Sequence, residues 1–130
     1  MKITNENTVS YGIYNRLWTA LLLGKTNTGC DEISIQITHV EPEGEQAIHQ
    51  HPQNQCYFII SGNGMMIIEN EQCAVKNGDA IYIPSNSLHG IKNITNKELI
   101  YLTANKSFDE SIENSTWKNR PIPHEQHTLD

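Results

Sequence analysis

The chain has 130 residues, of which 37% are hydrophobic and 18% are charged, and its formal net charge at pH 7 is -6. This length suits one core, so we expect a single domain over residues 1–130. An acidic chain of this kind is a poor partner for nucleic acid. The longest aliphatic run, residues 20–23, is too short to span a membrane, and the N-terminus lacks the apolar segment of a secretion signal. We therefore expect a cytoplasmic protein with no membrane partner.

Short runs of strand character follow one another along most of the chain. In chain order, the candidate strands are residues 16–23, 32–39, 55–60, 64–69, 72–75, 80–83, 88–93 and 98–104. Turn-forming stretches such as "SGNG" (61–64) and "NGD" (77–79) separate them. No segment before residue 105 keeps a helical period, so the pattern predicts an all-β sandwich or barrel. Residues 106–130 turn polar and predict an irregular tail, in which we expect His124 and His127 to have no role.

Residues 32–39 alternate strictly between apolar and polar side chains. Ile33, Ile35, Ile37 and His39 share one face, which we expect to be the buried face of the strand. His39 is then a candidate general base that faces the interior, because imidazole titrates near neutral pH. The alternative is a histidine at the end of a strand whose hydrogen bonds are satisfied and whose role is structural.

Two histidines stand one residue apart in the stretch "AIHQHPQNQCYFIISGNG", residues 47–64. Residues i and i+2 of a strand point to the same face, with Cβ atoms roughly 6 to 7 Å apart, so His49 and His51 can converge on one ion. Gln55 and Tyr57 continue in the same phase. An isolated H-x-H is also common on exposed strands, so the pair alone allows either an ordinary strand or a metal site.

A second stretch, "GDAIYIPSNSLHGIKN" (78–93), completes a pattern that resembles the cupin superfamily. The first cupin motif is matched by Gly44, His49, His51, Gln55 and Gly62, with one residue fewer than usual between the glycine and the first histidine. The second motif is matched by Gly78, Pro84, His89 and Asn93, with Asn86 where the family has glycine. The resemblance covers roughly residues 30–105 and implies a double-stranded β-helix, or jelly-roll barrel, with a metal ion in the mouth of the barrel.

The resemblance implies that His49, His51 and His89 hold one divalent transition metal ion. Three imidazoles suit Zn, Fe, Ni or Mn. Gln55 stands where the family has a glutamate ligand, and a neutral amide oxygen either binds the ion weakly or hydrogen-bonds to water on it. With fewer anionic ligands the ion is a stronger Lewis acid, which favours isomerase, lyase or hydrolytic chemistry over oxygen chemistry. Some small cupins that rearrange unsaturated uronic acids resemble this chain in their ligand set, which makes a sugar acid a candidate substrate.

Two further residues have open roles near such a site. Tyr57 lies in phase with the ligand face, so it either donates to a substrate oxygen or fills the barrel. The three cysteines, Cys30, Cys56 and Cys73, are odd in number and form no C-x-x-C pair, so we expect reduced and mostly buried thiols. Cys56 is adjacent to Gln55 and should point away from the metal.

Three classes of function fit this sequence. The first is a metal-dependent enzyme of isomerase or lyase type that acts on a small polar or anionic molecule. The second is a non-haem metal dioxygenase, and the third is a cupin that binds a ligand without catalysis. A homodimer is the default for small cupins, and the apolar strand at residues 16–23 could pair either with a second subunit or within the monomer.

Overall fold

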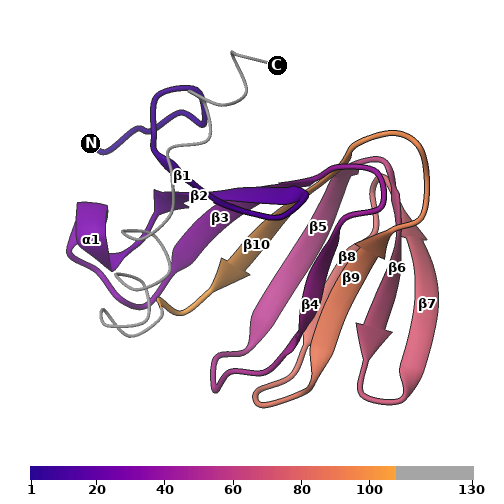
Figure 1. Ribbon diagram of the computed structural model, residues 1–130. Helices are drawn as coiled ribbons and strands as arrows, with labels where there is room; N and C mark the ends of the chain where they lie inside the picture. The colour runs from indigo at the N-terminus through magenta and orange to yellow at the C-terminus, as the bar shows by residue number, and fades with distance from the viewer. Residues whose placement is uncertain (108–130) are drawn as a thin grey trace.

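A computed structural model describes residues 1–107 of the chain (Figure 1). The elements in this range are β1 (Tyr11–Tyr14), β2 (Leu17–Leu23), α1 (Lys25–Thr28), β3 (Ser34–Val40), β4 (Glu45–His49), β5 (Gln55–Ser61), β6 (Asn63–Ile68), β7 (Glu71–Lys76), β8 (Ala80–Ile83), β9 (His89–Asn93) and β10 (Leu99–Asn105). Every expected strand is present. The sequence did not predict β1, the limits of β4, or the single turn of α1. Most of the expected tail, with His124 and His127, lies outside the described residues.

The strands form two antiparallel sheets that enclose one core (Figure 1). The larger sheet has the order β1-β2-β3-β10-β5-β8, and the smaller has the order β4-β9-β6-β7. The core contains buried side chains of both sheets, among them Tyr57 and Ile59 from β5, Met66 from β6 and Ile91 from β9. Consecutive short strands that alternate between two facing sheets form a jelly roll. The predicted all-β jelly-roll fold is therefore confirmed.

The isoleucines of β3 face away from this core, contrary to the expectation from their alternation. Ile37 packs on the outer side of the larger sheet with Tyr11, Trp18 and Ala20, in a second cluster partly formed by the N-terminal segment. Ile33 is 60% exposed. The inward face of β3 is the one that carries Ser34 and other polar residues. Strict alternation identifies two faces of a strand, but here Ile37 packs with Tyr11 of β1 and Trp18 of β2 on the outer face, so the more apolar face is not the inner one.

Strand β2 lies inside the larger sheet, between β1 and β3. Pairing within the chain therefore accounts for residues 16–23, and this strand does not offer a free edge to a second subunit. The three cysteines are free, as expected, but all of them are exposed, so the expectation of buried thiols was wrong. Within residues 1–107 the structure contains no helix long and apolar enough to cross a membrane.

Candidate metal centre

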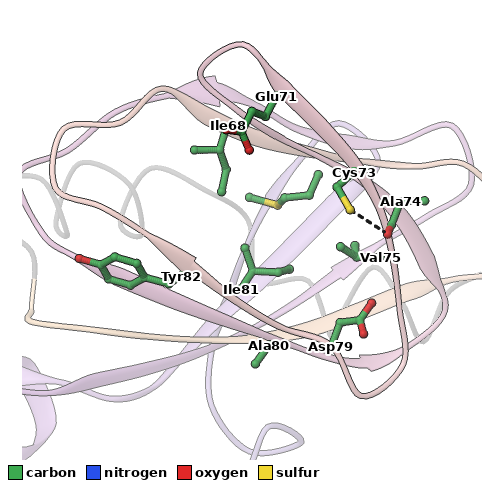
Figure 2. Close-up of a pocket in the computed structure, with 10 residues that line it drawn as sticks. Ile68, Glu71, Cys73, Ala74, Val75, Asp79, Ala80, Ile81 and Tyr82 are labelled. Carbon is green, nitrogen blue, oxygen red and sulfur yellow. Dashed lines mark hydrogen bonds between the residues drawn. The ribbon is translucent and has the colours of Figure 1, made fainter.

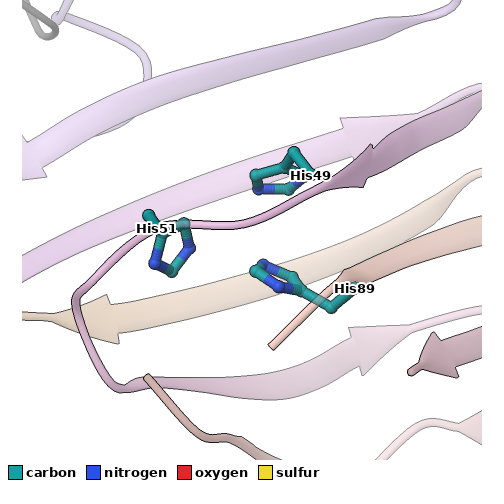
Figure 3. Close-up of side chains that lie close together, drawn as sticks. All are labelled: His49, His51 and His89. Atoms are coloured by element: carbon teal, nitrogen blue, oxygen red, sulfur yellow. The ribbon is translucent and has the colours of Figure 1, made fainter. Parts of the chain in front are cut away.

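Two short segments of the smaller sheet and one crossing loop bring three histidines together (Figure 3). His49 is the last residue of β4 and pairs across the ladder with His89, the first residue of β9. His51 lies beyond the end of β4, in the loop of residues 50–54. That loop crosses to the larger sheet, where β5 begins at Gln55. We expected His49, His51 and Gln55 to follow one another in phase on one continuous strand. That expectation was wrong, because β4 ends before His51.

The three imidazole rings face one another across a small gap (Figure 3). One possible ligand atom from each of His49, His51 and His89 lies within 4.8 Å of the other two. The ring centroids are 4.3 Å apart for His49 and His89, 4.8 Å for His51 and His89, and 5.5 Å for His49 and His51. The structure thus positions three histidines to hold one metal ion.

A backbone carbonyl fixes the tautomer of each histidine. The Nδ1 atoms of His49 and His89 lie 2.8 Å from the carbonyl oxygens of Ala47 and Ser87. His51 Nδ1 lies 3.0 Å from the carbonyl oxygen of Gln53. Because a carbonyl only accepts, each Nδ1 carries the proton, which leaves Nε2 with a lone pair in the neutral ring. A hydrogen bond of this kind is the usual support for a metal-binding histidine.

Burial keeps two of these rings neutral. Burial lowers the pKa of His89 to about 4; the hydrogen bond to Ser87 raises it, and the nearby His49 and His51 lower it. Burial also lowers the pKa of His49, against the opposing hydrogen bond to Ala47. His89 is fully buried, and its Nε2 atom has no hydrogen-bond partner in residues 1–107. A buried, unpartnered lone pair that faces two other imidazoles fits a bound cation.

Gln55 places its side-chain oxygen beside the histidines. Its Oε1 atom lies 3.3 Å from His51 Nε2, while its Nε2 donates to Asn105 Oδ1 at 3.0 Å. Asn105 in turn donates to the carbonyl oxygen of Lys106 at 2.7 Å, which fixes its own orientation. Sequence reasoning identified Gln55 but missed Asn105. The sequence carries no signal for Asn105, because its role depends on its position opposite Gln55 in the β5–β10 ladder, and that pairing is not visible in the sequence.

Tyr57 and His39, the two candidate catalytic residues, lie in different parts of the fold. Tyr57 is buried in the core, and its ring centroid is 6.3 Å from that of His89. His39 lies on the outer face of the larger sheet, stacked on Trp18 with ring centroids 3.6 Å apart. Its ring nitrogens lie 3.0 Å from a carboxylate oxygen of Glu98 and 3.2 Å from one of Glu6. The structure therefore brings Tyr57 near the histidines and does not bring His39 there.

A separate pocket of about 440 Å³ lies between the edge strands β7 and β8 (Figure 2). Apolar side chains such as Val75 and Ile81 provide most of its lining, together with the acidic residues Glu71 and Asp79. None of the three clustered histidines is among the lining residues. This pocket is therefore distinct from the candidate metal centre.

Comparison with protein families agrees with the fold. The model of the family described as the cupin domain matches residues 36–105, a range that contains all three histidines. The chain belongs to this family. An uncharacterized protein of Methanocaldococcus jannaschii is 40% identical over 62 residues, which cover 46% of this chain and 50% of that protein. The chain therefore matches only half of the length of this relative.

Solved structures show the same fold with different reported activities. A predicted oxalate decarboxylase from Thermotoga maritima is 20% identical, with a TM-score of 0.73 over 82% of this chain and 100% of that chain. The polyketide cyclase RemF from Streptomyces resistomycificus is 20% identical, with a TM-score of 0.74 over 83% of this chain and 80% of that chain. At these identities the likeness shows the fold alone.

Proposed function

We propose that this cupin is a metal-dependent enzyme that performs isomerase-type or lyase-type chemistry on a small polar or anionic organic molecule. His49, His51, His89 and Gln55 would hold one divalent ion, with Zn, Fe, Ni and Mn as candidates. One observation carries the proposal: every donor in this set is neutral, and backbone carbonyls direct the three Nε2 lone pairs. The candidate cluster in residues 1–107 contains no aspartate or glutamate.

A divalent ion in this site supplies a Lewis acid that polarises a carbonyl or hydroxyl oxygen, and neutral donors leave its positive charge largely uncompensated. Residues of both sheets orient the side chains of that site. Asn105 holds the amide of Gln55 so that its oxygen faces His51. Burial of His89 excludes water from one side of the cluster.

Tyr57 is the proposed hydrogen-bond donor to a substrate oxygen. Burial raises the pKa of Tyr57 well above its ordinary value, although hydrogen bonding with Tyr101 opposes that shift. The phenol therefore stays protonated across the physiological range, so it can donate a hydrogen bond but cannot act as a base. Its ring also stacks on that of Tyr101, with centroids 4.7 Å apart, which holds it in place. His39 is too far from the cluster in the fold to share this task.

Metal analysis combined with turnover assays tests the proposed function. Protein purified without added metal should contain about one transition metal ion per chain, and the His49→Ala variant should lose it. NMR in D₂O with 2-keto acids, 2-hydroxy acids and unsaturated uronic acids should show bond rearrangement or exchange of the α-proton without oxygen uptake. Oxygen consumption would instead identify a dioxygenase, and tight binding without turnover would identify a ligand-binding cupin. Protein without metal, and unable to bind zinc, would exclude the proposal.

We also propose that the chain forms a cytoplasmic homodimer through the outer face of the larger sheet. Phe58 and Ile60 on β5 are 47% and 38% exposed, and Tyr82 on the neighbouring β8 is 60% exposed. These side chains continue the apolar outer face beyond the part covered by the N-terminal segment. Contiguous exposed apolar surface of this kind marks an interface in many proteins, and a second copy offers a surface of the same character.

A further inference from the structure

The inner face of the larger sheet changes from apolar to polar along the barrel. The ladder registers define four cross-strand rows: Leu17, Val40 and Leu99; Thr19, Thr38, Tyr101 and Ile59; Leu21, Gln36, Thr103, Tyr57 and Ile81; and Ser34, Asn105, Gln55 and Ile83. The last row contains Gln55, which adjoins the histidine cluster. Polar side chains therefore gather at the end of the barrel where the candidate metal centre lies. No residue in the four rows is charged.

Two hydroxyl groups in these polar rows have no hydrogen-bond partner in residues 1–107. Ser34 is 0% exposed and Thr103 is 4% exposed, and the hydroxyl oxygen of each is buried. Thr19, one row deeper, is different, since its hydroxyl lies 2.8 Å from that of Thr38 and donates to the carbonyl oxygen of Ile37 at 3.2 Å. A buried hydroxyl without a partner destabilises a fold. Ser34 and Thr103 thus carry a cost that alanine and valine would avoid.

The position of the two hydroxyls defines the size of a ligand that could reach them and the metal centre together. Gln55, Asn105 and Ser34 are consecutive across three strands, and strands are spaced about 4.8 Å apart, so the backbones of Gln55 and Ser34 lie about 10 Å apart. Thr103 is two residues from Asn105 along β10. An extended six-carbon chain that carries an oxygen atom at each end is about 9 Å long, which is close to this distance.

We infer that Ser34 and Thr103 form an uncharged subsite for the hydroxyl groups of a small polyhydroxylated ligand, whose single anionic or carbonyl group faces the metal centre. Each hydroxyl can both donate and accept, which matches a ligand hydroxyl that does the same. A second anionic group on the ligand would meet no cation on this face. The inference deepens the proposed function and rests on it for the position of the ion.

Titration calorimetry with three six-carbon probes tests this subsite on the zinc-loaded protein. Gluconate carries one carboxylate and a row of hydroxyls, hexanoate has the carboxylate alone, and 6-phosphogluconate adds a second anionic group. Gluconate should bind at least about tenfold more tightly than hexanoate, because its hydroxyls find partners, and 6-phosphogluconate should bind no more tightly than gluconate. Ser34→Ala and Thr103→Val should each weaken gluconate binding about 5- to 10-fold and leave hexanoate binding unchanged. Undetectable gluconate binding, or variants that bind it as the wild type does, would overturn the inference.

Thermal unfolding of the metal-free protein gives a second readout that does not depend on the ion. Ser34→Ala and Thr103→Val should leave the melting temperature unchanged or raise it, because each removes an unpartnered hydroxyl. The matched control Thr19→Val removes a partnered hydroxyl and should lower the melting temperature by about 3 to 5 °C. A drop of that size for Thr103→Val would show that its hydroxyl serves the fold, and the inference would fail. If the protein binds no zinc but the three variants show the expected melting temperatures, the proposed metal centre is wrong and the unpartnered state of the two hydroxyls still holds.

Discussion

Gln55 Oε1 lies 3.3 Å from His51 Nε2, and both atoms are hydrogen-bond acceptors when the imidazole is neutral. The hydrogen bond to the carbonyl oxygen of Gln53 keeps the only proton of the neutral His51 ring on Nδ1. The NH₂ group of Gln55 donates to Asn105 and so is not the group that faces His51. Two acceptors at this distance repel each other unless a donor or a cation lies between them. A cation shared by the two atoms removes the conflict.

Substitution of Gln55 tests this relationship. Gln55→Glu should bind zinc about tenfold more tightly than the wild type, because it adds an anionic ligand, and should turn over its substrate more slowly, because the ion becomes a weaker Lewis acid. Gln55→Leu should weaken zinc binding about tenfold. Competition with a chromophoric chelator measures both affinities. Equal affinities for all three proteins would show that Gln55 does not contact the ion.

His39→Phe separates structural from catalytic roles for this residue. Phenylalanine keeps the stacking on Trp18 but loses the two carboxylate partners, Glu6 and Glu98. We expect the free energy of unfolding to fall by about 1 to 2 kcal/mol, because these partners are partly exposed and the pairs are partly screened. Zinc affinity and kcat should stay at wild-type values. A large loss of kcat in a stably folded variant would restore the general-base role.

Acid should destabilise the metal-free protein through His89. Its pKa of about 4 in the folded chain is lower than the ordinary value of 6.5, so the unfolded chain binds a proton more readily. The stability that the neutral His89 contributes to the folded chain is fully present above about pH 6.5 and is lost as the pH falls toward 4. Chemical denaturation across this pH range should show that the free energy of unfolding falls by on the order of 2 kcal/mol more for the wild type than for His89→Gln. Parallel curves for the two proteins would contradict the assignment.

The proposed dimer interface can be disrupted by charge. Phe58→Glu should convert the dimer to a monomer, because it buries a carboxylate at the centre of the exposed apolar face. Ile94→Glu is the matched control, since Ile94 is also exposed, at 51%, but lies in the loop between β9 and β10. Sedimentation velocity measures the mass of each variant. A monomeric wild type, or a dimer that survives Phe58→Glu, would refute this interface.

The sequence predicts those features that depend on local spacing. Turn residues separate the strands correctly, and Asn86 takes the left-handed conformation, with φ of 62°, that the glycine of the family motif suggested. The spacing of the two motifs also identifies the three histidines, even though His51 lies in a loop and not on the strand that the argument assumed. In this case the family resemblance was more reliable than the strand geometry.

Features that depend on long-range packing could not be predicted in the same way. The outward direction of Ile37 on β3 depends on its packing with Tyr11 of β1 and Trp18 of β2, which are distant in the chain. Asn105 reaches Gln55 only because β10 pairs with β5, although 50 residues separate the two in the chain. His39 was misplaced for the same reason, since alternation gives the two faces of a strand but not the partner of each.

The crossing at residues 50–54 would give a bound ion a mechanical role in addition to the proposed chemical one. His49 and His89 belong to one sheet and Gln55 to the other, so a cation held by all three would tie the two layers together at this end of the jelly roll. Its removal with a chelator would release that tether while both hydrogen-bonded ladders stay intact. The amide protons near this end would then exchange with solvent faster than those at the opposite, apolar end.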